Sequence, residues 1–138
     1  MAQAVAEETR SASVSTGKTM NIVLWLLQIA AAGMFVMVGL SKLSGNEQMV
    51  GLFAAIGLGQ WFRYLTGALE VAGAILLVIP RTSGLGALML VGVMLGAVMT
   101  HLFVVGGSPL MAIILLGVTS LVAWERRQQT MNLLRGAW

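Results

Sequence analysis

The sequence has 138 residues, of which 58% are hydrophobic and only 9% are charged, whereas charged residues make up about a quarter of an average soluble domain. This composition excludes an ordinary water-soluble domain, because the chain has too few polar side chains to cover its surface, and it indicates one domain in a lipid bilayer. The net charge of +3 comes from basic residues scattered at the ends of apolar segments, and the chain has no cysteine, so neither nucleic-acid binding nor thiol chemistry within the chain is expected.

The N-terminal residues 1–19 are rich in Ala, Ser, Thr and Glu and show no hydrophobic period, which predicts a disordered tail. The first apolar stretch follows at Met20–Leu43 and is uncharged from Asn21 to Ser41. It begins too late and is too long for a secretory signal peptide. Its length is that of a transmembrane helix, since about 20 apolar residues cross a bilayer.

The apolar segments that follow differ in length. Met49–Gly57 is too short to cross the bilayer and is expected to lie in the interface or to re-enter the bundle. The longer segments are about Gly59–Pro80, Gly84–Gly106 and Pro109–Trp124. Pro80 ends a helix, and Pro109 suits a first turn. The sequence therefore predicts an all-α, polytopic membrane protein, a four-transmembrane-helix bundle over residues 20–124 with a short interfacial or re-entrant helix between helices 1 and 2.

The placement of Lys and Arg predicts the orientation, because these residues accumulate in cytoplasmic loops. With four crossings, only Lys42 and Arg63 fall toward the outer side, where Trp61 and Tyr64 form an aromatic belt. The other basic residues share the inner side: Arg10, Lys18, Arg81, Arg126, Arg127 and Arg135. We therefore expect a multi-pass protein of the inner cell membrane with both termini in the cytoplasm, including a C-terminal tail of residues 125–138.

Ionisable side chains within or beside the predicted spans all fall in the outer half: Lys42, Arg63, Glu70 and His101. Charges at this depth are costly, so they tend to face the bundle interior, to pair and to mark sites. Gln28 lies on the same face of the first segment as Lys42. These residues together form the candidate ligand-binding set, in which Glu70 and His101 are the candidate catalytic residues because they can exchange protons. A structural lock that fixes helix register explains the same set equally well.

Small residues predict where helices approach closely. Gly67 and Gly73 flank Glu70, and Gly92 and Gly96 form a small-xxx-small stripe on the third long segment. Such faces also predict a homo-oligomer or a larger assembly. The chain has a single histidine, and its 10 methionines are spread over apolar faces, so neither a bis-histidine haem within the chain nor a metal site is expected.

Short motifs in the apolar segments resemble those of a known family. They are, in order, Gly39–Leu43 (GLSKL), Gly67–Gly73 (GALEVAG), Ile79–Arg81 (IPR) and Ala97–His101 (AVMTH). Together they resemble the DoxX-like family over about Asn21–Trp124. The resemblance implies a four-helix integral membrane protein and singles out Lys42, Glu70, Arg81 and His101 as matching positions. It also implies a link to redox complexes, since the family is named for a membrane component of thiosulfate:quinone oxidoreduction.

The first functional hypothesis is a membrane subunit of a respiratory or redox complex, at most a non-catalytic or quinone-site subunit of an oxidoreductase. A quinone or a similar lipophilic molecule would bind near Glu70 and His101, and no cofactor is expected in the chain itself. The expected partners are the lipid bilayer and other redox subunits or further copies of this chain. Two alternatives stay open: a small proton-coupled transporter that uses Glu70, and a structural or assembly subunit without a ligand.

Overall fold

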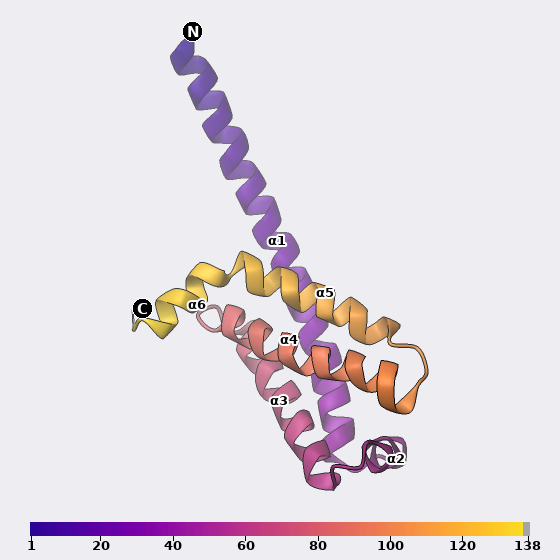
Figure 1. Ribbon diagram of the computed structural model, residues 1–138. Coiled ribbons are helices and arrows are strands. Elements are labelled where there is room, and N and C mark those ends of the chain that lie inside the picture. The colour runs from indigo at the N-terminus through magenta and orange to yellow at the C-terminus, as the bar shows by residue number, and fades with distance from the viewer. Residues whose placement is uncertain (137–138) are drawn as a thin grey trace.

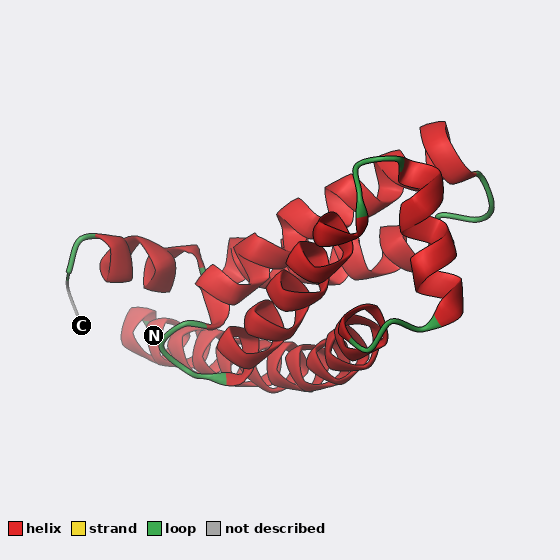
Figure 2. Cartoon of the chain, turned by 90° about the horizontal axis from the view of Figure 1, so that it is seen from below, coloured by secondary structure: helices red, strands yellow, loops and turns green. Residues whose placement is uncertain are grey.

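The computed structural model describes residues 1–136, and over that range it consists of helices joined by short loops, with no β-strand (Figures 1 and 2). The predicted all-α class is therefore confirmed. The elements in chain order are α1 (Ala2–Leu43), α2 (Glu47–Ile56), α3 (Gln60–Val78), α4 (Ser83–Thr100), the π-helix η1 (His101–Val105), α5 (Leu110–Glu125) and α6 (Arg127–Leu134).

Among the described residues, 3 helical stretches are long and apolar enough to cross a membrane. They are Gly17–Leu43 of α1, Gln60–Val78, which is α3, and Ser83–Val105, which combines α4 with η1. Helix α5 is apolar but has only 16 residues, or about 24 Å at 1.5 Å per residue, against a hydrocarbon layer of about 30 Å. The membrane character predicted from composition is thus confirmed, whereas α5 falls short of the length of a fourth crossing.

Helices α1, α3, α4 and α5 pack as a ring, in which α1 contacts α3, α3 contacts α4, α4 contacts α5 and α5 returns to α1. Each contributes a fully buried apolar side chain to the core: Phe35, Leu77, Leu90 and Val122. Large apolar side chains also cover the outside of the ring, including Leu26, Ile75 and Leu95. An apolar exterior of this extent suits contact with lipid.

Glycines decide how closely the helices approach. A Cβ atom on Gly67 would lie 3.0 Å from the Gly39 carbonyl oxygen, and one on Gly73 would lie 2.7 Å from Leu90. Both glycines therefore sit at helix contacts, where the sequence predicts them. A Cβ atom on Gly92 or Gly96 would have nothing within 4 Å, so among residues 1–136 the small-residue stripe on α4 makes no close helix contact.

The two ends of the chain are more helical than the sequence predicts. Helix α1 begins at Ala2, and its N-terminal part projects far beyond the other helices (Figure 1), with residues 1–10 exposed. These residues favour a helix without tertiary contacts, because Ala, Glu and Arg have high helix propensity and extending an existing helix needs no new nucleus. At the other end, residues 127–134, which lie in the predicted C-terminal tail, form α6.

The short segment between α1 and α3 is helical as well. Asn46 caps α2, since its side chain accepts a hydrogen bond of 2.9 Å from the Gln48 N–H. Helix α2 ends at Ile56, and Gly57 is its C-cap. Three glycines that flank α2 adopt positive φ: 76° at Gly45, 83° at Gly57 and 101° at Gly59. These left-handed positions let the chain turn sharply into and out of α2.

Candidate functional site

The centre of the site is an ion pair between α1 and α3. Lys42, in the last turn of α1, donates a hydrogen bond of 2.5 Å to Glu70 Oε1 in the middle of α3. The Glu70 side chain has no exposed area, and that of Lys42 is 10% exposed. The close contact at Gly39 and Gly67 brings the two helix backbones near enough for these side chains to meet. The structure thus joins two of the charged residues that the sequence singled out.

Arg63 lies next to this pair but binds backbone and neutral groups. Its Nη1 donates to the Lys42 carbonyl oxygen, and its Nε donates to Gln60 Oε1 at 2.8 Å. Its guanidinium also stacks 4.3 Å from the centre of the Tyr64 ring. A basic side chain on the last carbonyls of a helix stabilises its C-terminus. Arg63 therefore fixes the end of α1, and it leaves the Glu70 carboxylate to Lys42.

The second oxygen of Glu70 has an unusual environment. Among the side chains that the structure describes, Glu70 Oε2 is the one buried nitrogen or oxygen atom without a hydrogen-bond partner. An unmet buried acceptor costs about 1–3 kcal/mol, and more when it is charged. Such an atom needs a specific explanation, since buried polar groups in proteins are nearly always paired.

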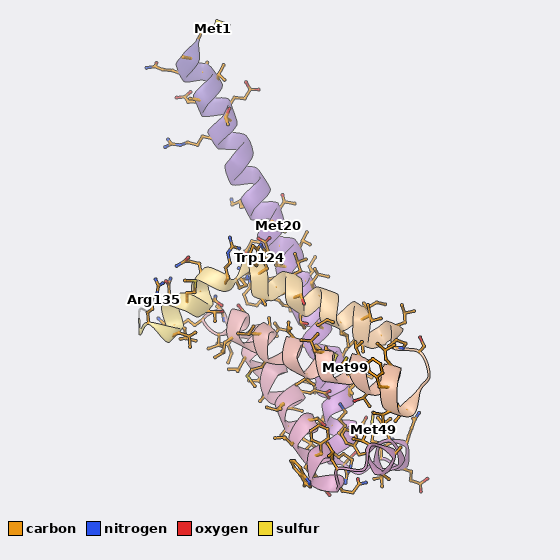
Figure 3. The ribbon with its side chains drawn as sticks, in the orientation of Figure 1. Met1, Met20, Met49, Met99, Trp124 and Arg135 are labelled. Carbon is orange, nitrogen blue, oxygen red and sulfur yellow. The ribbon has the colours of Figure 1, made fainter. Side chains whose placement is uncertain are left out.

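Glu70 forms part of the wall of a cavity of about 860 Å³. All of the helices except α6 contribute to this wall, and it is mostly apolar. Figure 3 labels two of its residues, Met49 on α2 and Met99 on α4. Its polar side chains are Lys42, Thr66, Glu70, Thr100 and His101. A cavity of this size with few polar groups is typical of sites for small lipophilic molecules.

Helix α2 covers the end of the cavity that carries the ion pair. Its Phe53 is buried and packs edge-on against Phe62 of α3, with ring centres 5.8 Å apart. Lys42 Nζ lies 5.8 Å from the centre of the Phe53 ring, within the range of a cation–π contact. Gln60 donates a hydrogen bond of 3.1 Å to the Val50 carbonyl oxygen of α2. The aromatic ring of Phe53, held by Phe62, therefore lies against the lysine of the ion pair.

His101 reaches the same cavity without touching the ion pair. It begins η1, and its Nδ1 lies 3.1 Å from the Gly106 carbonyl oxygen. Since a carbonyl oxygen only accepts, Nδ1 must be the donor, and in the neutral ring Nε2 is left as an acceptor. The structure thus brings His101 and Glu70 to one cavity but not to a shared hydrogen bond. Within the described residues, no group of three or more His, Asp or Glu side chains is placed to hold a metal ion.

Gln28 and Arg81 do not belong to this site. Gln28 lies about 20 Å along α1 from Lys42, where its Nε2 donates to the Leu77 carbonyl oxygen at 2.9 Å and its Oε1 accepts from Arg126 at 3.2 Å. Gln28 and Lys42 are both buried on α1, but they lie too far apart along the helix axis to belong to one site. Gln28 contacts Leu77 and Arg126, whereas Lys42 contacts Glu70. Arg81 is exposed in the loop between α3 and α4.

The region around Gln28 forms a second polar cluster that sequence reasoning missed. Gln129 of α6 accepts hydrogen bonds from Ser83 Oγ at 2.9 Å and from the Gly84 N–H at 3.0 Å, and it donates to the Pro80 carbonyl oxygen. It thereby caps the N-terminus of α4, which has no side-chain cap of its own. Burial lowers the pKa of Arg126, and the neighbouring charge of Glu125 opposes this shift.

Apolar helices that surround a buried ion pair and an apolar cavity define a polytopic membrane protein with a polar site between its helices. The chain belongs to the DoxX-like family, whose sequence profile matches residues 26–124. No curated protein and no solved structure matches it. The family match contains the ion pair and the whole cavity wall, and it ends before Gln129.

Proposed function

We propose that this protein binds a lipophilic small molecule of the quinone class inside the membrane, as a subunit associated with a respiratory or redox complex. The observation that carries this proposal is Glu70, a residue of the wall of a large apolar cavity, whose Oε2 is buried without a hydrogen-bond partner. The apolar wall would hold the tail of such a molecule. Lys42, Glu70 and His101 would hold its polar head group. The link to a redox partner rests on the family resemblance.

We also propose a topology with four crossings, in which α5 is the fourth. Its support is that α5 is apolar and packs between α1 and α4, both of which are long enough to span. The Lys and Arg distribution supports cytoplasmic termini in the inner membrane. Helix α2 would then lie at the outer interface as a cover over the cavity. Because the chain has no cysteine, single cysteines introduced at Ser11, Glu47 and Arg135 can report their side of the membrane through labelling by an impermeant maleimide.

The first experiment is purification of the full chain from its native membrane under gentle conditions, with mass spectrometry of the lipids and proteins that accompany it. A stoichiometric quinone or a redox partner is the expected result. The Glu70→Gln variant, which keeps the size of the side chain, should retain less of the small molecule, because it loses the unpaired carboxylate acceptor. The matched control Glu125→Gln changes an exposed glutamate outside the cavity and should retain it.

The ion pair itself favours a second candidate, a structural or assembly role without a ligand. In that case Lys42 and Glu70 only fix the register of α1 against α3. The Glu70→Gln protein would then come out of the membrane with the same lipids as the parent chain, and the whole effect of the substitution would appear in its folding or in its assembly with other subunits.

A further inference from the structure

We infer that the cavity selects ligands whose head group carries a hydroxyl, such as a hydroquinone or another lipophilic phenol, over the corresponding carbonyl compounds. This inference rests on the proposed function and specifies the ligand of the same site. It follows from which hydrogen-bond donors and acceptors on the cavity wall are already used.

Most donors on the wall are satisfied by the protein itself. Thr66 Oγ1 lies 3.2 Å from the Arg63 carbonyl oxygen, and Thr100 Oγ1 lies 2.8 Å from that of Gly96, and each hydroxyl donates there. His101 Nδ1 donates to the Gly106 carbonyl oxygen. These three side chains therefore offer a ligand only acceptor positions, the hydroxyl lone pairs and Nε2 of the neutral imidazole.

The ion pair offers one group of each kind. Lys42 Nζ has three N–H donors, of which Glu70 Oε1 takes one. Glu70 Oε2 is an acceptor without a partner. A hydroxyl group can accept from Lys42 and donate to Oε2 at the same time, so it satisfies both members of the pair. A carbonyl oxygen can only accept, and it would leave Oε2 buried and unpaired.

The surroundings of the ion pair strengthen the preference for a hydroxyl over a carbonyl oxygen. Oε2 itself is covered, so a head group must move a neighbouring side chain slightly to reach it. Lys42 is the side chain best suited to move, because it is long, flexible and 10% exposed. Around the pair the wall is apolar, with Phe53, Phe62 and Leu69 among its residues. An unmet acceptor in such surroundings keeps its full cost.

The test compares three ligands that share one short alkyl tail: a 1,4-hydroquinone, its quinone and its dimethyl ether. Binding to the full chain in lipid nanodiscs is measured by equilibrium dialysis without oxygen, so that the redox forms do not interconvert. The hydroquinone should bind about tenfold more tightly than either of the others. The dimethyl ether separates the effect of the donor from that of the redox state, because it keeps the oxygens but has no O–H to donate.

The Glu70→Gln variant tests the assignment to Oε2. Its side-chain amide brings an N–H donor to this position, so the preference for the hydroquinone should disappear while the quinone still binds. Glu125→Gln should retain the preference, and the melting temperature of each variant in nanodiscs shows that the compared proteins are folded. Equal binding of hydroquinone and quinone by the parent chain, or a preference that survives Glu70→Gln, overturns the inference and leaves the proposed function standing. Absence of binding by all three ligands overturns both.

Discussion

The two ends of the helix ring carry buried polar clusters of opposite character. At one end, Gln28, Arg126 and Gln129 form hydrogen bonds between the helices, and each buried side-chain nitrogen or oxygen atom described there has a hydrogen-bond partner. At the other end, Lys42 and Glu70 form a close ion pair, but one carboxylate oxygen stays unpaired beside a cavity of about 860 Å³. A fully satisfied cluster serves stability, whereas an unsatisfied one beside open space retains a capacity to bind. The predictions below test this contrast.

The largest effect is expected from Lys42→Met. This substitution leaves the buried Glu70 carboxylate without its cation, and breaking a buried pair from one side typically costs about 3–5 kcal/mol. We expect a fall of this size in the free energy of unfolding, measured by denaturant titration in detergent micelles. The double variant Lys42→Met/Glu70→Gln removes both charges and should recover more than half of the loss.

Lys18→Met is the control, because it removes an exposed lysine from the same helix and should leave stability nearly unchanged. A cost below about 1 kcal/mol for Lys42→Met would mean that the pair contributes no more than a surface salt bridge. In that case the Lys42–Glu70 pair would not be what holds α1 and α3 together at the site.

The next largest effect on stability is expected in α4, where Gly86 is tightly packed and Gly92 lines the cavity. A Cβ atom on Gly86 would lie 2.6 Å from the Leu77 backbone nitrogen, and backbone cannot move aside cheaply. Gly86→Ala should therefore lower the free energy of unfolding by about 1–3 kcal/mol. Gly92 is on the same helix but has nothing within 4 Å, so Gly92→Ala should be neutral or slightly stabilising by helix propensity. Thermal unfolding of the pair measures the difference, and equal losses would contradict the described contact of α3 with α4.

Much of the fold could be predicted from the sequence, because a bilayer leaves few choices. The uncharged runs such as Asn21–Ser41 can only be helices there, and Pro80 marks the end of α3 within two residues of its observed end at Val78. The helical state of residues 2–19 could not be predicted in the same way. It depends on continuation from the membrane helix and not on a hydrophobic pattern.

The site was predictable as a set of rare charges but not as a geometry. Lys42 and Glu70 stand out because charges inside apolar segments are costly, and the structure pairs them. Gln28 shows the limit of helical periodicity, since a shared face says nothing of distance along the axis. Nothing in the predicted tail marked Gln129. The one indication lay elsewhere, since the N-terminus of α4 needs a cap that the Pro80–Ser83 turn does not supply.

The smallest effect is expected from Gln129→Leu, at the satisfied end. It removes the acceptor for Ser83 Oγ and the Gly84 N–H, and loss of a helix cap costs about 1 kcal/mol. We expect a modest fall in the free energy of unfolding and an unchanged affinity for any ligand of the cavity. Gln128→Leu, which alters an exposed neighbour on α6, controls for the added apolar side chain. A weaker ligand affinity in Gln129→Leu alone would show that the two ends are coupled through α4, and the satisfied cluster would then have a part in binding as well as in stability.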